Sequence, residues 1–239
     1  MSSLRSDLLI NPQDLFNVSN NAQASATNLG GLATTGDGRY FRFVTAGAVA
    51  LVPGKLQQAP AEVTGDQNLT AVAAAIGDLT IATTSTVTVT ANQYAGGWAV
   101  ISVTPGQGYQ YKIASHPAAT AGTLSLTLED PIQVALTTSS RFDLVANPYK
   151  NVVVNPTTAT STPIGVAVAA TPIGYYGWVQ TKGVAAVLAD GTVTVGTAVV
   201  ASNATAGAVE ALTGVQAPVG IAVTGTATTE YGAINLLLD

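Results

Sequence analysis

The last third of the chain repeats itself, and this repeat constrains the fold more than any other feature. Residues 162–168 read TPIGVAV, residues 217–223 read APVGIAV 55 positions later, and the Tyr-Gly pair at 176–177 recurs at 231–232. In each copy the proline suits the start of a strand, where its missing N–H costs little, and the glycine permits a close approach to a neighbouring strand. Two matched segments in one register predict two related strand–loop–strand units. We expect residues 156–239 to form a small antiparallel β-barrel in which the two units superpose.

Alternating side chains predict further strands in the middle of the chain. Leu124, Leu126 and Leu128 alternate with serine and threonine, and turn residues such as Asn147-Pro148 separate one such run from the next. Runs of period two with this spacing are typical of antiparallel sheets. The fold class that we expect is all-β, with antiparallel β-sandwich or β-barrel domains.

One segment has helical spacing instead. Leu69, Val72 and Ile76 fall on one face of a helix over residues 68–76, and Gly77 is a suitable residue to end it. We therefore expect one short helix, which would be stable only if it packs against the rest of the protein.

Changes in composition divide the chain into three parts. Residues 1–36 are polar and irregular and are expected to form an extended N-terminal arm, followed by a β-rich middle domain over residues 37–155. The C-terminal small β-barrel, with its 55-residue-offset repeat, occupies residues 156–239. A stretch rich in threonine and serine, residues 155–163, is the expected hinge between the last two parts.

The arm contains two groups of apolar residues, which are Leu8, Leu9 and Ile10, and then Leu15 and Phe16. Two interpretations remain open: the arm is a disordered tail, or it becomes ordered on a partner. In the second interpretation these five residues are the candidate partner-binding site, and they fill apolar sites on a neighbouring subunit.

The composition excludes several classes of partner. Only 9% of the residues are charged, against about 25% in an average soluble protein. A surface with so few charges predicts a protein that functions within an assembly. The net charge is −5, and the last 89 residues carry only one basic residue, Lys182, so we expect no nucleic-acid partner. No apolar run approaches the roughly 18 residues of a membrane helix, and the N-terminus lacks the apolar core of a signal peptide. We expect no membrane partner and synthesis in a cytoplasm.

Few residues are suited to catalysis or metal binding. The chain has no cysteine and a single histidine, His116, at the end of an expected strand, where a structural or exposed side chain is typical. The acids are scattered except for Glu129-Asp130, which suits a turn, and no nucleophile motif is present. We expect no enzymatic activity, no cofactor and no metal.

Tyr175, Tyr176 and Trp178 form the densest aromatic cluster. Packing within the core of a hairpin is the preferred interpretation. The alternative is an energetic hot spot in a protein–protein interface.

Several stretches together resemble structural proteins of tailed phages. They are GRYFRF at 38–43, LVPGK at 51–55, GWVQ at 177–180 and ADGT at 189–192. The repeated Pro-Ile/Val-Gly-Val/Ile-Ala-Val motif is similar to the small β-barrels of phage capsid decoration proteins, which are also called cement proteins. This resemblance implies a structural protein on the outer face of an icosahedral head, bound to the major capsid protein and commonly trimeric. The chain is larger than many members of that family, because it adds the arm and a middle β region.

The leading hypothesis is therefore a non-enzymatic cement protein that is located on the virion. It would bind the major capsid protein through many weak contacts and form a homotrimer, with a dimer as the second possibility. Two rival functions remain open: a tail or fibre component that binds a host-surface glycan, and a subunit that itself forms a shell or tube.

Overall fold

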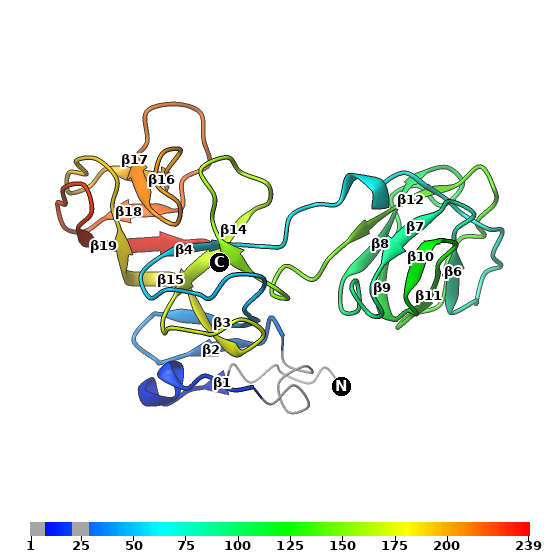
Figure 1. Cartoon of the computed structure of the whole chain (residues 1–239), viewed down its shortest axis with the longest axis horizontal. Helices are drawn as coiled ribbons and strands as arrows, with labels where there is room; N and C mark the ends of the chain where they lie inside the picture. Colours follow the sequence, from blue (N-terminus) through cyan, green and yellow to red (C-terminus); the bar gives the residue numbers. More distant parts are fainter. Residues whose placement is uncertain (1–7, 21–28) are drawn as a thin grey trace. The chain divides into compact units, whose positions relative to one another are not determined.

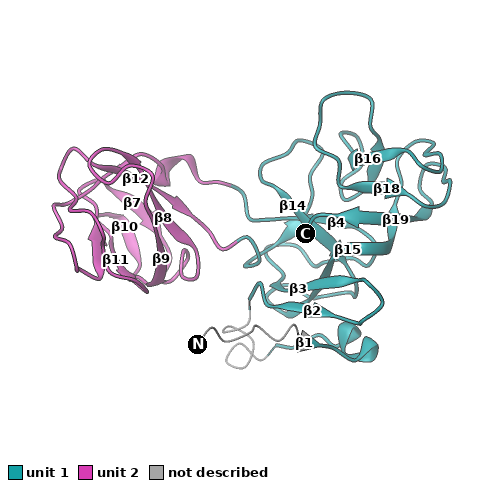
Figure 2. Ribbon diagram, turned by 180° about the vertical axis from the view of Figure 1, so that it is seen from behind, with its two compact units in different colours: residues 1–61, 148–239 teal, residues 62–147 magenta. Residues whose placement is uncertain are grey.

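A computed structural model describes residues 8–20 and 29–239, which form two compact units (Figures 1 and 2). Unit 1 combines residues 1–61 with residues 148–239, and unit 2 comprises residues 62–147. The described strands pair antiparallel except for one parallel pair near the N-terminus, two isolated bridges are also parallel, and the described helical segments are short 3-10 turns. The expected all-β fold class is confirmed.

Unit 1 contains two small barrels, and barrel 1 draws its strands from distant parts of the sequence. Its strands are β3 (Tyr40–Thr45), β4 (Leu56–Gln58), β13 (Val153–Val154), β14 (Pro163–Ala167) and the first part of β15 (Tyr176–Leu188). Hydrogen-bonded neighbours follow the order β3, β15, β14, β4, β13. A bridge between Ala46 and Val152 joins β13 back to the end of β3, which completes the ring.

Barrel 2 repeats this arrangement with consecutive strands. It uses the second part of β15, followed by β16 (Ala198–Ala201), β17 (Val209–Ala211), β18 (Gly220–Ala222) and β19 (Tyr231–Leu237). The order is β15, β19, β18, β16, β17, and a bridge between Ala189 and Val209 completes the ring. The two barrels therefore have the same topology, and β15 belongs to both of them (Figure 1).

The strand register of the repeat is the same in both barrels. Val166 pairs with Gln180 in barrel 1, and Ile221 pairs with Asn235, each 55 residues later, in barrel 2. The adjacent pairs match in the same way. The sequence repeat is thus a structural repeat, but its two units lie in two barrels instead of in one barrel over residues 156–239.

Gly165 and Gly220 occupy the same position in the two barrels, and the backbone explains both. A Cβ atom on Gly165 would lie 2.8 Å from the carbonyl oxygen of Gln180, and one on Gly220 would lie 2.6 Å from that of Asn235. Real side chains do not fit at such distances, so each barrel requires glycine where β14 or β18 crosses its neighbour.

Equivalent apolar residues fill the two barrels. The interior of barrel 1 contains Val44, Leu51, Val152, Ala167 and Val179. The interior of barrel 2 contains Val187, Val193, Val209, Ala222 and Ile234. These small side chains suit a narrow barrel interior, which explains why a chain rich in valine and alanine builds two such cores.

The units divide the chain differently from the expected domains 37–155 and 156–239. The strands β3 and β4 were assigned to the middle domain, but they pair with β15 and β14 and complete barrel 1. Unit 2 is an insertion between β4 and β13. Barrel 2 connects the equivalent strands β16 and β17 through residues 202–208 alone.

Unit 2 is built from the alternating segments that the sequence indicated. Its strands are β5 (Leu69–Thr70), β6 (Thr80–Ala82), β7 (Val87–Val89), β8 (Trp98–Val103), β9 (Gln110–Ser115), β10 (Ala119–Gly122), β11 (Ser125–Leu128) and β12 (Arg141–Val145). They form a sheet in the order β5, β12, β8, β9, β11, β6, together with the pair β7–β10, and a 3-10 turn η3 (Thr64–Asp66) precedes them. Leu124, Leu126 and Leu128 are buried on one side, as alternation predicted.

The expected helix at residues 68–76 is wrong. The backbone N–H of Ala71 donates to the carbonyl of Ser140, and that of Ala74 donates to Leu136, so this segment bonds to distant strands. Leu69 and Ala71 are buried and Ile76 is 68% exposed, which is not the pattern of one buried helical face. Backbone hydrogen bonds to other segments of unit 2 outweigh the helical spacing of the apolar residues here.

The N-terminal region is folded onto unit 1 where it is described. The short strand β1 (Leu8–Leu9) pairs in parallel with β2 (Leu32–Thr34), which in turn pairs with β3. Between them lies the 3-10 turn η1 (Pro12–Phe16), whose first turn is capped by the side chain of Asn11. The expectation of an extended arm over residues 1–36 is therefore wrong for residues 8–20 and 29–36, and residues 1–7 and 21–28 lie outside the described part of the chain.

Candidate interaction surfaces

The five residues that the sequence nominated for partner binding divide into two groups. Ile10 and Leu15 are 8% and 2% exposed and pack with Ala33 and Phe41 of this same chain. Leu9 and Phe16 point the other way, with 72% and 63% of their surfaces exposed. Of Leu8, the structure describes only its strand pairing with Ala33.

This division has a simple physical cause. Considered by itself, the arm has too few apolar residues to form a core. In the fold, Ile10 and Leu15 instead extend a cluster begun by Phe41 and bordered by Trp178. Only the outward side chains, Leu9 and Phe16, remain available to a partner.

The aromatic cluster is used for packing, in line with the preferred interpretation. The Phe43 ring stacks on Tyr176 with centroids 5.8 Å apart and meets Trp178 edge-on at 4.9 Å. Tyr176 is buried, and its backbone forms a bridge with Ser19 from the N-terminal region. These rings hold the arm and β3 together on the outer side of barrel 1.

An ion pair connects the last residue of the sequence to this region. The Arg42 guanidinium donates to both carboxylate oxygens of Asp239, at 2.9 Å and 2.8 Å, and Thr181 donates to the same carboxylate at 2.7 Å. Burial by itself raises the pKa of Asp239, but the hydrogen bonds from Arg42 and Thr181 outweigh it and hold that pKa below its usual range. The pair links β3, β15 and the end of barrel 2.

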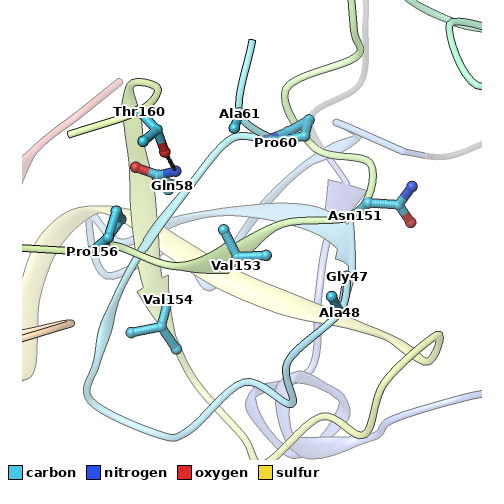
Figure 3. A pocket seen from close by; sticks show the side chains of 10 residues that line it. All are labelled: Gly47, Ala48, Gln58, Pro60, Ala61, Asn151, Val153, Val154, Pro156 and Thr160. Carbon is cyan, nitrogen blue, oxygen red and sulfur yellow. Dashed lines mark hydrogen bonds between the residues drawn. The ribbon is translucent and has the colours of Figure 1, made fainter. Parts of the chain in front are cut away.

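A pocket of about 670 Å³ opens on unit 1, and all of its lining residues belong to that unit (Figure 3). The side chains around it are mostly small and apolar. They include Ala48, Pro60, Ala61, Val153, Val154 and Pro156. An open apolar lining with few polar groups suits contact with another protein better than it suits a charged metabolite.

Gln58 is the main polar group of this pocket. It is 1% exposed, and its Nε2 donates to the Thr160 hydroxyl at 2.7 Å, whereas its Oε1 has no hydrogen-bond partner. A buried carbonyl oxygen without a hydrogen-bond partner lowers the stability of the fold. Sequence reasoning missed this residue, because it took residues 57–61 for a connector; the one available signal was a pair of glutamines directly after Leu56.

The single histidine serves the structure of unit 2. His116 is buried, its Nε2 accepts from the backbone N–H of Tyr94 at 3.0 Å, and its Nδ1 lies 2.8 Å from the carbonyl of Pro117. The Tyr94 hydroxyl donates to the buried carboxylate of Asp66, and burial followed by this hydrogen bond raises the pKa of Tyr94. The three residues tie a loop to the sheet of unit 2.

No group of three or more histidine, cysteine, aspartate or glutamate side chains lies close enough to hold a metal ion within residues 8–20 and 29–239. Over the same residues, no helix is both long enough and apolar enough to cross a membrane.

Comparison with known proteins adds no family: no family model matches the chain, and neither a curated protein nor a solved structure is similar to it.

Proposed function

We propose that this protein is a structural, non-enzymatic virion component that decorates a phage capsid and binds the outer face of the major capsid protein shell. The observation that carries the proposal is the duplicated barrel of unit 1. Two barrels in one chain offer two separate attachment surfaces, which suits binding to a lattice of identical subunits. The sparse charge of the chain and the resemblance of its repeated motif to capsid decoration proteins support the same role.

The pocket beside Gln58 is the surface that we propose for contact with the shell. Its apolar lining matches an apolar segment of the partner. Such a contact needs no metal, cofactor or catalytic group. In this role the protein acts as a homo-oligomer, and a trimer is the form that we propose.

Binding to expanded heads that lack the protein tests this function. Wild-type protein should sediment with such heads, whereas Ala48→Arg and Ala61→Arg, both at exposed positions that line the pocket, should reduce binding at least tenfold. Ala50→Arg, at an exposed position outside the pocket, is the matched control and should bind normally. Failure of the wild-type protein to bind heads would refute the proposal.

One observation favours the rival glycan-binding role. Tyr109 of unit 2 is 43% exposed and stacks with Tyr111 at a centroid distance of 6.5 Å, which is a geometry that can support a sugar ring. A glycan array probed with the whole protein decides between the roles. Specific retention that is lost in Tyr109→Ala, without binding to heads, would favour a tail or fibre component.

A further inference from the structure

The duplication allows the outer surfaces of the two barrels to be compared position by position. In barrel 1, the outer side of the sheet formed by β3, β15 and β14 carries Phe41, Tyr176 and Trp178. Residues 8–19 of this chain cover it: Leu15 packs against Phe41, and Ser19 bridges to Tyr176. In barrel 1, therefore, an apolar segment shields the apolar outer side of this sheet from water.

The equivalent face of barrel 2 is largely open in the described chain, although the ring of Tyr231 lies close to Gly54 at its edge. Strands β18, β19 and β15 are neighbours (Figure 1). Their pairing places Val184, Asn235 and Ile221 side by side. Five large side chains project from this face, and we call them the bare face. They are Val184, Ile221, Val223, Tyr231 and Leu237, with exposed fractions of 51%, 40%, 45%, 51% and 48%.

The contrast at equivalent positions is sharp. Tyr176 is 8% exposed in barrel 1, and Tyr231, its counterpart 55 residues later, is 51% exposed. Phe41, which pairs with Gln180 in barrel 1, is 0% exposed, and Val184, which pairs with the counterpart Asn235 in barrel 2, is 51% exposed. An apolar cluster of this kind on a monomer marks an interaction site.

The same chain carries an apolar surface that could cover this face. On the outward side of the N-terminal region, Leu9, Phe16 and Val18 are 72%, 63% and 37% exposed, and we call these three residues the ridge. The inward side of that segment is already occupied by barrel 1. Opposite charges lie beside the two surfaces: Asp14 is in η1 next to the ridge, and the exposed Lys182 pairs across the strands with Leu237 at the edge of the bare face.

We propose that the bare face of one molecule receives the ridge of a second copy of this chain. Residues 8–18 would then lie between two barrels, barrel 1 of their own molecule and barrel 2 of the neighbour. The ridge and the bare face are different surfaces, so the contact is head-to-tail, and repetition of it closes a ring when the rotation between neighbours permits. This inference rests on the proposed homo-oligomeric role and specifies its contact surfaces.

The mass of the protein in solution tests this contact. Wild-type protein should form a multiple of the 23.9 kDa chain. The face variant Ile221→Lys with Val223→Lys and the ridge variant Leu9→Lys with Phe16→Lys should both run as single chains with unchanged circular dichroism, because all four positions are exposed. Val195→Lys with Val215→Lys, at positions 68% and 105% exposed elsewhere in barrel 2, is the control and should remain assembled.

Mixing distinguishes head-to-tail contact from other arrangements. An equal mixture of the face variant and the ridge variant keeps one intact contact and should give a species of twice the chain mass. Because the chain has no cysteine, Phe16→Cys and Ile221→Cys in two separate chains should also form an intermolecular disulfide on oxidation, whereas Phe16→Cys with Val195→Cys should not.

Four results would overturn the proposal: a monomeric wild type, dissociation by the face variant alone, dissociation by the control, or no cross-link between positions 16 and 221. Dissociation by the face variant alone would mean that the face pairs with itself or with another protein. None of these measurements uses viral heads, so their failure is distinct from a failure of head binding.

Discussion

At the scale of single residues, the duplication identifies a strained position. Thr229 has a left-handed backbone with φ of 70°, and Gly174, its counterpart 55 residues earlier, has φ of 75°. The same backbone bonds hold both turns, since the N–H of Gly174 donates to Ala46 and that of Thr229 to Ala189. Glycine adopts this conformation without cost, whereas a β-branched residue does not.

Replacing Thr229 by glycine should therefore stabilise the protein. Relief of strain of about 1–3 kcal/mol outweighs the added flexibility of the unfolded chain, which costs roughly 0.5–1 kcal/mol. We expect Thr229→Gly to raise the free energy of unfolding by about 1 kcal/mol in urea denaturation. The reciprocal change Gly174→Thr should lower it, and equal effects of the two substitutions would contradict the proposed equivalence.

The carboxylate of Asp239 predicts a dependence on pH. Its pKa is lowered in the folded protein, so the stabilisation it contributes is present above its unfolded pKa and is lost as the pH falls through its folded pKa. Asp239→Asn should lower stability by roughly 1 kcal/mol at pH 7, because the bidentate bond to Arg42 is only partly shielded from water. Melting temperatures of the two proteins should converge below pH 4, and a constant difference down to pH 2 would contradict this assignment.

At the scale of elements, side-chain alternation predicted strands well where one side of a strand is buried. β11 and its neighbours follow the expected period, because a buried side and a solvated side impose it. Residues 68–76 have the apolar spacing of a helix, but Ala71 and Ala74 bond to Ser140 and Leu136, which lie more than sixty residues away in the sequence. The folding of residues 8–19 was equally hidden, because Phe41 completes their core.

The cluster around Phe41 makes η1 part of the fold. Leu15→Ala removes a side chain that is 2% exposed and should lower the free energy of unfolding by about 3 kcal/mol. In the background of Ile221→Lys with Val223→Lys, which removes the proposed contact between chains, Phe16→Ala, one residue later and 63% exposed, should change it by less than about 0.5 kcal/mol. Urea denaturation measures both. If both substitutions change the free energy of unfolding by similarly small amounts, residues 8–19 are not part of the folded core.

At the scale of the whole molecule, the sequence could not reveal that unit 2 is an insertion. The repeat at residues 162–168 and 217–223 was visible, but the matching of β4 to β16 and of β13 to β17 is expressed in strand pairing and hardly in residue identity. For the same reason the surfaces proposed for binding were only partly predicted: Leu9 and Phe16 were nominated, whereas Gln58 and the bare face were not.

The insertion predicts that the two units fold independently. Replacing residues 62–147 by a short glycine–serine linker should leave unit 1 folded, because barrel 2 connects the equivalent strands with residues 202–208 only. Residues 62–147 alone should fold as well, since they have a separate core. Two cooperative melting transitions of the isolated pieces, each near a transition of the whole protein, are expected. Loss of cooperative unfolding in the shortened unit 1 would show that unit 2 is required for its fold.

The shared strand β15 has a mechanical consequence. Its thirteen residues span about 40 Å at roughly 3.3 Å per residue, and they are hydrogen-bonded to β3 at one end and to β19 at the other. A pull on one barrel is thus transmitted to the other along a covalent backbone flanked by two rows of bonds loaded in shear. Tension between the two barrels therefore acts on one continuous strand, whose regular pairing is interrupted by a register shift at residues 180–182 and by the left-handed backbone of Gly183.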